Sequence, residues 1–87
     1  MIEVEVTKIF EKLYLKLPYD FRCKADSKTK LFQANPFHPS LRTKKLEPHH
    51  EDIWSFWVDR DYRIKFRFIS AQSVHFLFIG NRKDIYR

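Results

Sequence analysis

The sequence predicts an α+β protein in which a twisted, antiparallel-rich sheet carries a helical hairpin on one face. Two observations predict this class. Segments in the carboxyl-terminal half alternate or are continuously apolar, as strands do, and residues 8–34 repeat their apolar side chains with a helical period. The chain has one glycine and 44% hydrophobic residues, which argues against disorder. A chain of 87 residues is expected to form a single domain over residues 1–87.

The chain begins with a predicted strand and a first helix. Residues 2–6 alternate as a strand, with the apolar side chains directed inward. These inward side chains are Ile2, Val4 and Val6. Thr7 is suited to cap a helix over residues 8–17, which Pro18 ends. The apolar face of this helix consists of Ile9, Phe10, Leu13, Tyr14 and Leu17.

A second helix is predicted from Asp20, as its cap, to about Ala34. The residues that mark it are Phe21, Ala25, Lys28 and Phe32. Asn35 stops this helix, because the residue before a proline is pushed out of the helical region. Two helices this close in the sequence predict a helical hairpin.

The next segments predict an edge strand and a β-hairpin. Residues 37–42 form a loop, and residues 43–46 a short edge strand, since lysines suit an exposed edge. Residues 53–58 and 62–69 are expected to pair in antiparallel fashion across the tight connection 59–61. The first of these two strands directs Trp54, Phe56 and Val58 to one face.

Residues 74–79 are nearly all apolar and predict a central strand that is buried on both faces. Gly80 is expected to supply backbone freedom as the chain leaves the sheet. The predicted element order is therefore β-α-α-β-β-β.

A row of cations follows one face of the strand at residues 62–69. Arg63, Lys65 and Arg67 alternate with the apolar side chains of that strand. The whole chain has 17 basic and 11 acidic residues, a net charge of +6, which favours a nucleic acid, a membrane surface or an acidic protein as partner. Two plainer interpretations stay open: the cations are only a solvated face, or they pair with Glu3 and Glu5 of the first strand.

Several other function classes find no support in the sequence. The single Cys23 excludes an internal disulfide, fits a reducing cytoplasm and has no evident partner for nucleophilic chemistry. No signal peptide is visible, and no window approaches the roughly 20 apolar residues of a membrane span. Residues 49–52 lack the spacing of a metal site, so no metal or cofactor is expected. Of the remaining histidines, His38 reads as structural and His75 as a sheet residue.

Five short motifs, in a fixed order, resemble one known family. They are Asn35-Pro36-Phe37-His38-Pro39-Ser40-Leu41-Arg42, Ile53-Trp54-Ser55-Phe56, Asp61-Tyr62-Arg63-Ile64, Ile79-Gly80 and Asp84-Ile85-Tyr86-Arg87. Together with the length and the basic charge, they resemble the RelE/ParE superfamily of bacterial and archaeal toxins, and most closely its RelE/YafQ-like branch. The resemblance covers essentially the whole chain.

The resemblance implies the toxin of a type II toxin–antitoxin system, acting in the cytoplasm and neutralised by a cognate antitoxin. RelE-like relatives cut mRNA in the ribosomal A site, so the ribosome and mRNA are further implied partners, with no membrane or small-molecule partner. Two alternatives stay open. ParE-like relatives inhibit DNA gyrase and cut nothing, and a degenerate member would only bind antitoxin or RNA.

Metal-independent RNA cleavage needs a base near the ribose 2′-OH, cations at the phosphate and an acid for the departing 5′-oxygen. Arg63 aligns with the strand arginine of the family, and Tyr86 with its terminal tyrosine. The expected catalytic residues are Arg63, Arg82, Tyr86 and His50. The expected RNA-binding residues are Lys44, Lys45, Lys65, Arg67, Lys83 and Arg87.

Each of these roles has a plainer alternative. Tyr86 can equally pack against the sheet, and His50 can be a polar loop residue like its neighbour His49. The chain also departs from the family: residues 81–83 replace a His-Asp pair of near relatives, and Ser55 and Trp57 replace lysines of RelE. Candidate exposed anchors for an antitoxin, each of which can also be core, are Phe37, Leu41, Trp57 and Ile85.

Overall fold

The computed structural model describes residues 1–46 and 52–85. Its elements, in order, are β1 (Glu3–Val6), α1 (Lys8–Leu15), α2 (Tyr19–Ala34), the 3-10 turn η1 (Pro39–Leu41), β2 (Lys44–Lys45), β3 (Ile53–Trp57), β4 (Tyr62–Ser70), β5 (Ser73–Asn81) and α3 (Arg82–Ile85). The strands form one sheet in the order β1-β5-β4-β3-β2. β1 runs parallel to β5, and the other neighbouring strands are antiparallel, which confirms the predicted class.

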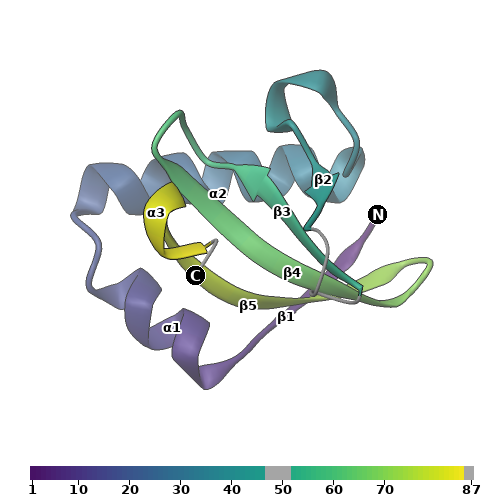
Figure 1. Ribbon diagram of the computed structural model, residues 1–87, viewed down its shortest axis with the longest axis horizontal. Coiled ribbons are helices and arrows are strands. Elements are labelled where there is room, and N and C mark those ends of the chain that lie inside the picture. Colours follow the sequence, from purple (N-terminus) through teal and green to yellow (C-terminus); the bar gives the residue numbers. More distant parts are fainter. Residues whose placement is uncertain (47–51, 86–87) are drawn as a thin grey trace.

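The helices divide between the two sides of the sheet. In Figure 1, α2 runs behind the strands and α1 lies below it at the lower left, and a short turn joins the two in the predicted helical hairpin. The short α3, which the sequence did not predict, lies in front of β4 and β5 and packs against both. The sheet therefore has a face covered by the hairpin, and an opposite face that only α3 covers among the described helices.

α1 is capped as predicted but buries a narrower stripe than its sequence pattern indicated. The Thr7 hydroxyl accepts a hydrogen bond from the amide of Phe10 at 3.0 Å and donates one to the carbonyl of Leu77 at 3.1 Å. Phe10 is buried, but Ile9 is 63% exposed, so its assignment to the buried face was wrong. Val6 of β1 is likewise exposed. Both residues lie at the rim of the molecule, because β1 is an edge strand and α1 follows directly from it.

α2 begins before its predicted cap. Its N-cap is Pro18, whose extended backbone (φ −56°, ψ 152°) leads into the helix without a side-chain hydrogen bond. The prediction of Asp20 as cap was therefore wrong, and Asp20 lies in the first turn, where a carboxylate favours the helix dipole. The helix ends at Ala34 with Asn35 extended, as the following proline predicts.

Phe32 of α2 is the centre of the hydrophobic core. It is fully buried, and its ring centroid lies 4.6 Å from that of Phe56, 4.9 Å from Phe66 and 5.7 Å from Phe76. These rings come from β3, β4 and β5, so one helical side chain ties three strands together. Leu41, proposed as an exposed anchor, is also fully buried in this core.

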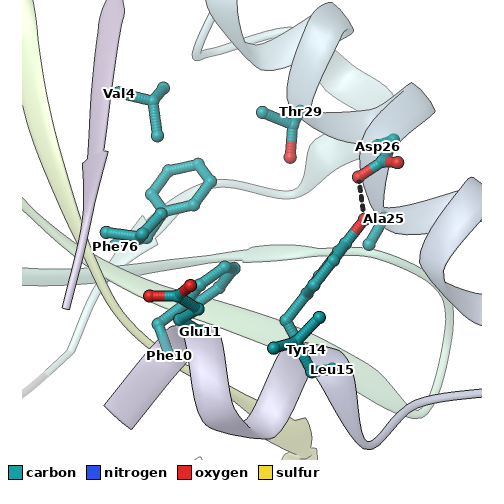
Figure 2. A pocket seen from close by; sticks show the side chains of 10 residues that line it. Val4, Phe10, Glu11, Tyr14, Leu15, Ala25, Asp26, Thr29 and Phe76 are labelled. Carbon is teal, nitrogen blue, oxygen red and sulfur yellow. Dashed lines mark hydrogen bonds between the residues drawn. The ribbon is translucent and has the colours of Figure 1, made fainter. Parts of the chain in front are cut away.

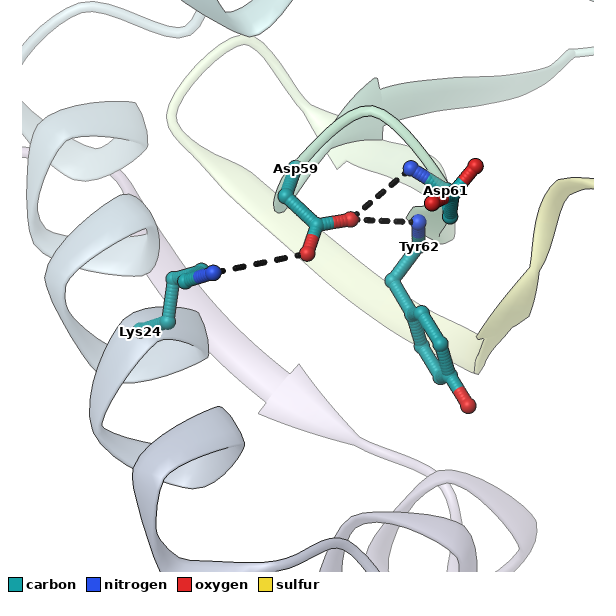
Figure 3. Close-up of polar contacts among 4 residues, drawn as sticks. All are labelled: Lys24, Asp59, Asp61 and Tyr62. Carbon is teal, nitrogen blue, oxygen red and sulfur yellow. Dashed lines mark hydrogen bonds and ion pairs between the residues drawn. The ribbon is translucent and has the colours of Figure 1, made fainter.

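The β3–β4 hairpin is closed by Asp59. One carboxylate oxygen accepts the backbone amides of Asp61 and Tyr62, at 2.8 and 2.7 Å, and so replaces the missing backbone partners of the turn (Figure 3). The other oxygen lies 3.5 Å from the ammonium group of Lys24 on α2. This contact ties the hairpin to the helix layer.

β5 differs from its prediction in two ways. It lies between β1 and β4, as expected for a central strand, but only the side chains facing the hairpin, such as Val74 and Phe76, are fully buried. The strand also continues to Asn81, so Gly80 does not mark the exit from the sheet and has no positive φ. Its missing side chain matters sterically, because a Cβ at Gly80 would lie 2.6 Å from a ring carbon of Phe78.

Candidate nucleic-acid interface

The strand registers gather cations on the sheet face opposite the α1–α2 hairpin. Arg63, Lys65 and Arg67 alternate with core residues along β4, and therefore all point to this side. Lys44 of β2 lies in the same row as Lys65, since each is paired with Ser55 of β3. We call the surface defined by these four basic residues the cationic face. Here the structure brings predicted RNA-binding residues from two strands together.

Lys45 does not belong to the cationic face. It pairs with Trp54, whose side chain packs against the core, and it therefore lies on the opposite side at the edge of the sheet. His75 lies on the cationic face, paired with Arg67 on one side and Glu5 on the other. Because β5 separates Glu5 from Arg67, the alternative in which first-strand acids pair with these cations is not observed in the described residues.

Arg63 is held rigidly and is nearly buried. Its side chain is 5% exposed, its Nη2 donates a hydrogen bond to the carbonyl of Arg60 at 3.0 Å, and its guanidinium carbon lies 4.3 Å from the ring centroid of Trp57. Ser55 beside it is also buried. Arg63 is thus a fixed charge beneath the surface, whereas Arg67 is exposed and Lys65 is half-buried against the ring of Phe78.

The carboxyl-terminal segment returns to the hairpin next to Arg63. Gly80 is the β5 partner of Arg63, and the amide of Arg82 donates to the carbonyl of Asp61 at 2.8 Å. Arg82 and Lys83 are exposed at the start of α3. Two expected catalytic residues, Arg63 and Arg82, are therefore neighbours in space. The others, Tyr86 and His50, and the RNA-binding candidate Arg87 lie outside the described residues.

α3 is anchored by Ile85, which is fully buried and lies outside the core cluster under the helical hairpin. Of the two roles left open for Ile85, an exposed anchor or a buried residue, the structure shows the buried one. Phe37, in contrast, is 56% exposed, although its ring also contacts Trp54 and Phe68. Burial of Ile85 fixes the start of the carboxyl-terminal segment against the sheet, and with it the position of Arg82.

Sequence reasoning missed Arg42 as a member of this site. Its guanidinium carbon lies 4.9 Å from the ring centroid of Trp57, the same ring that Arg63 contacts. Arg42 reaches this place because it ends the η1 turn in a left-handed conformation (φ 51°, ψ 41°). No local pattern in the sequence signals this contact, since it joins a loop to a strand 15 positions away.

Three exposed or half-buried cations on or beside the cationic face, Lys65, Arg67 and Arg82, decide its electrostatics toward solvent. The ion pair found in the described part of the chain, between Lys24 and Asp59, lies elsewhere. Among residues 1–46 and 52–85, no carboxylate forms an ion pair with Lys65, Arg67 or Arg82. Cations on a sheet attract anions, and phosphate groups are anions that guanidinium and ammonium groups bind well.

A groove of about 400 Å³ lies on the other side of the molecule, between β1, α1 and α2 (Figure 2). Its lining is mainly apolar and includes Val6, Phe10 and Leu15. At its edge the hydroxyl of Tyr14 donates a hydrogen bond of 2.7 Å to a carboxylate oxygen of Asp26. This bond, and to a smaller extent burial, raises the pKa of Tyr14 above its ordinary value of 10.0.

Neither a metal site nor a membrane segment is found in residues 1–46 and 52–85. No group of three or more His, Cys, Asp or Glu side chains is placed to hold an ion there. The helices in these ranges lack the length and apolar character that a bilayer-spanning helix requires.

Solved structures of toxins share this architecture. The YoeB/ParE toxin from Agrobacterium tumefaciens is 14% identical, with a TM-score of 0.77 over 93% of this chain and 99% of that one. YafQ from E. coli is 15% identical, with a TM-score of 0.76 over the full length of both chains. The archaeal RelE–RelB complex from Pyrococcus horikoshii gives 18% identity and a TM-score of 0.75, over 93% and 94%. This is the RelE/ParE toxin fold.

The fold that the sequence resemblance implied is therefore confirmed, and YoeB/ParE, YafQ and RelE toxins share it. No protein-family model matches the chain, and no curated protein does. At identities of 14–18% the shared architecture carries the similarity, and the function has to be argued from the residues of the cationic face.

Proposed function

We propose that this protein is the toxin of a type II toxin–antitoxin system and that it cleaves mRNA on the ribosome without a metal ion. The observation that carries the proposal is that Arg82 follows Gly80, the β5 partner of Arg63, at the edge of the cationic face of a RelE/ParE fold. Such an arrangement suits a phosphodiester, because fixed cations stabilise the charge that grows on the phosphate during cleavage.

In the proposed reaction, the ribose 2′-oxygen attacks the neighbouring phosphorus, and the bond from phosphorus to the 5′-oxygen breaks. The 2′-OH proton passes to a base, the departing 5′-oxygen takes up a proton, and the products are a 2′,3′-cyclic phosphate and a 5′-hydroxyl. We assign the proton transfers to Tyr86 and His50. These two assignments rest on the sequence alone.

The burial of Arg63 implies that the cations have different roles. With 5% of its surface exposed, Arg63 acts mainly through a fixed charge, which is strong at short range beneath the surface. Arg82 and Lys65 are more accessible, and we assign them direct contact with the scissile phosphate. Flanking RNA phosphates would contact Lys44, Arg67, Lys83 and Arg87. Lys45, which lies on the opposite side of the sheet at its edge, would contact RNA that bends around this edge.

We further infer that a cognate antitoxin covers the groove between β1, α1 and α2. RelE from Pyrococcus horikoshii and YafQ from E. coli were each solved in complex with a partner, RelB and DinJ. In this chain, large apolar side chains stand exposed at the groove or next to it, and they include Val6, Ile9 and Leu15. An apolar segment of an antitoxin would shield them from water.

A second candidate, inhibition of DNA gyrase without cleavage, is favoured by one observation. Ser55, which stands where RelE carries a lysine, is buried and offers no cation. A member that binds but does not cut would leave mRNA intact.

Induced expression in E. coli, followed by mapping of mRNA ends on ribosomes, tests the proposal. We expect growth arrest with new 5′-hydroxyl ends inside translated messages. Arg82→Ala should lower cleavage by about 10²-fold, the usual loss when one charge-stabilising donor is removed. Lys30→Ala on α2 removes an equal charge far from the site and should change nothing. Arrest with intact mRNA and altered DNA supercoiling would reject cleavage in favour of gyrase inhibition.

A further inference from the structure

Arg42 is an exposed cation whose place is fixed by one aromatic ring. Its left-handed backbone (φ 51°) is uncommon for a residue with a side chain, and the turn that imposes it is closed by a hydrogen bond from the Arg42 amide to the carbonyl of Pro39 at 3.3 Å. The side chain then lies against Trp57, with 4.9 Å between guanidinium carbon and ring centroid. Within the described ranges, the guanidinium forms no ion pair with a carboxylate.

The ring of Trp57 thereby contacts two guanidinium groups, those of Arg42 and Arg63. Each is attracted to the negative face of the indole, but the two positive charges repel one another. An anion next to the ring would be attracted by both charges. Arg42 has solvent access, which the nearly buried Arg63 lacks, so an incoming anion meets Arg42 first.

This pair also extends the cationic face in a definite direction. Trp57, Arg63 and Gly80 form one row across β3, β4 and β5, and Arg82 comes two residues after Gly80, with its amide bonded to the carbonyl of Asp61. Neighbouring strands lie about 4.8 Å apart, so the row spans on the order of 10 Å from Trp57 to β5. Arg42 contacts Trp57 at one end of the row, and Arg82 follows Gly80, the β5 residue at the other end. A short stretch of RNA is long enough to contact both.

We propose that Arg42 and Trp57 form a second RNA-backbone subsite, which binds a phosphodiester next to the one that Arg82 and Lys65 contact. Trp57 is a positioning residue in this subsite, because it orients the guanidinium group of Arg42 for two-point contact with phosphate oxygens. The inference rests on the proposed function, since it assumes that the cationic face takes RNA.

Binding of a fluorescein-labelled single-stranded RNA oligonucleotide, measured by anisotropy at several salt concentrations, tests this subsite. Removal of one phosphate contact should reduce the slope of log affinity against log salt by about 0.7. We expect this reduction, with several-fold weaker binding at low salt, for Arg42→Ala and Arg42→Gly. Glycine suits the left-handed backbone, so the second variant removes the cation without a cost to folding.

Two further variants separate charge from position. Arg42→Lys keeps the charge but loses the flat, two-point geometry, so the salt slope should stay while the affinity falls. Lys30→Ala on α2 matches the charge loss of Arg42→Ala and should leave both quantities unchanged. If Arg42→Ala behaves like Lys30→Ala, the subsite is overturned while the proposed function stands. If the wild-type protein does not bind RNA at low salt, both the proposed function and the subsite are rejected.

Discussion

The guanidinium carbon of Arg63 lies 4.3 Å from the ring centroid of Trp57, within a site where its Nη2 also donates to the Arg60 carbonyl. The central cation of the proposed site is therefore also a packing residue. Removal of the Arg63 side chain would create a cavity next to Trp57 and would also remove a positive charge. Activity measurements on Arg63 variants need a stability measurement beside them, and a conservative replacement.

Arg63→Ala should lower the free energy of unfolding by roughly 2–4 kcal/mol, because a nearly buried cation–π contact and a charged hydrogen bond are lost together. Arg63→Lys keeps the charge and part of the packing, so it should cost less stability yet still weaken growth arrest. Urea denaturation and growth on induction measure the two effects. Arg60→Ala is the control, since its side chain is exposed and only its carbonyl is used. Full toxicity in a folded Arg63→Ala variant would contradict the assignment.

The Asp59 turn offers a test of the hairpin itself. Asp59→Ala should lower the free energy of unfolding by about 1–2 kcal/mol, since the amides of Asp61 and Tyr62 lose their acceptor. Asp59→Asn keeps an acceptor oxygen and should cost about half as much. Lys24→Ala removes only a half-exposed ion pair and should change stability by less than about 0.5 kcal/mol. Chemical denaturation compares the three, and equal losses for Lys24→Ala and Asp59→Ala would show that the ion pair matters more than the turn.

The element order was predictable because strand alternation, proline positions and the Thr7 cap are local signals. The burial of single side chains was less predictable, because it depends on tertiary placement. Ile9 fits a helical apolar face, but α1 lies at the rim of the molecule and leaves Ile9 exposed. The Arg63 row was predictable from alternation, whereas its burial was not. That burial comes from Trp57 and from the return of the chain after Gly80, and neither contact is visible in a pattern of neighbouring residues.

Gly80 makes a stringent steric prediction. A methyl group there would approach a ring carbon of Phe78 to 2.6 Å, so that the ring has to move away from residue 80. Gly80→Ala should therefore lower the free energy of unfolding by about 1–2 kcal/mol, at the lower end of overpacking costs because Phe78 is only half-buried. Thermal unfolding measures the loss. Phe78→Leu/Gly80→Ala provides the control, since the smaller side chain should accept the methyl group and recover part of the stability.

The Tyr14–Asp26 hydrogen bond predicts a pH dependence. A pKa raised in the folded state means that stability from this bond is fully present below pH 10.0, the ordinary pKa, and is lost as the pH rises through the folded pKa. The difference in unfolding free energy between the wild-type protein and the Tyr14→Phe variant should be constant near neutral pH and should become smaller above about pH 10. Denaturation series from pH 7 to 11 measure it. A difference that grows with pH would mean that Asp26 does not hold the hydroxyl proton.

The apolar groove yields the prediction that separates the antitoxin surface from the toxic site. Leu15 is 60% exposed at the groove, so Leu15→Glu should leave folding and growth arrest intact. It should nevertheless prevent rescue by the proposed cognate antitoxin, because a carboxylate cannot be buried under an apolar segment without a partner. Ile69→Glu is the matched control. Ile69 is similarly exposed, at 54%, but it lies on β4 away from the groove, so rescue should persist.

Growth curves with both genes induced distinguish the variants. Rescue of Leu15→Glu to the level of Ile69→Glu would place the antitoxin on another surface, whereas failure of both would indicate a general loss of solubility, which size-exclusion chromatography would reveal.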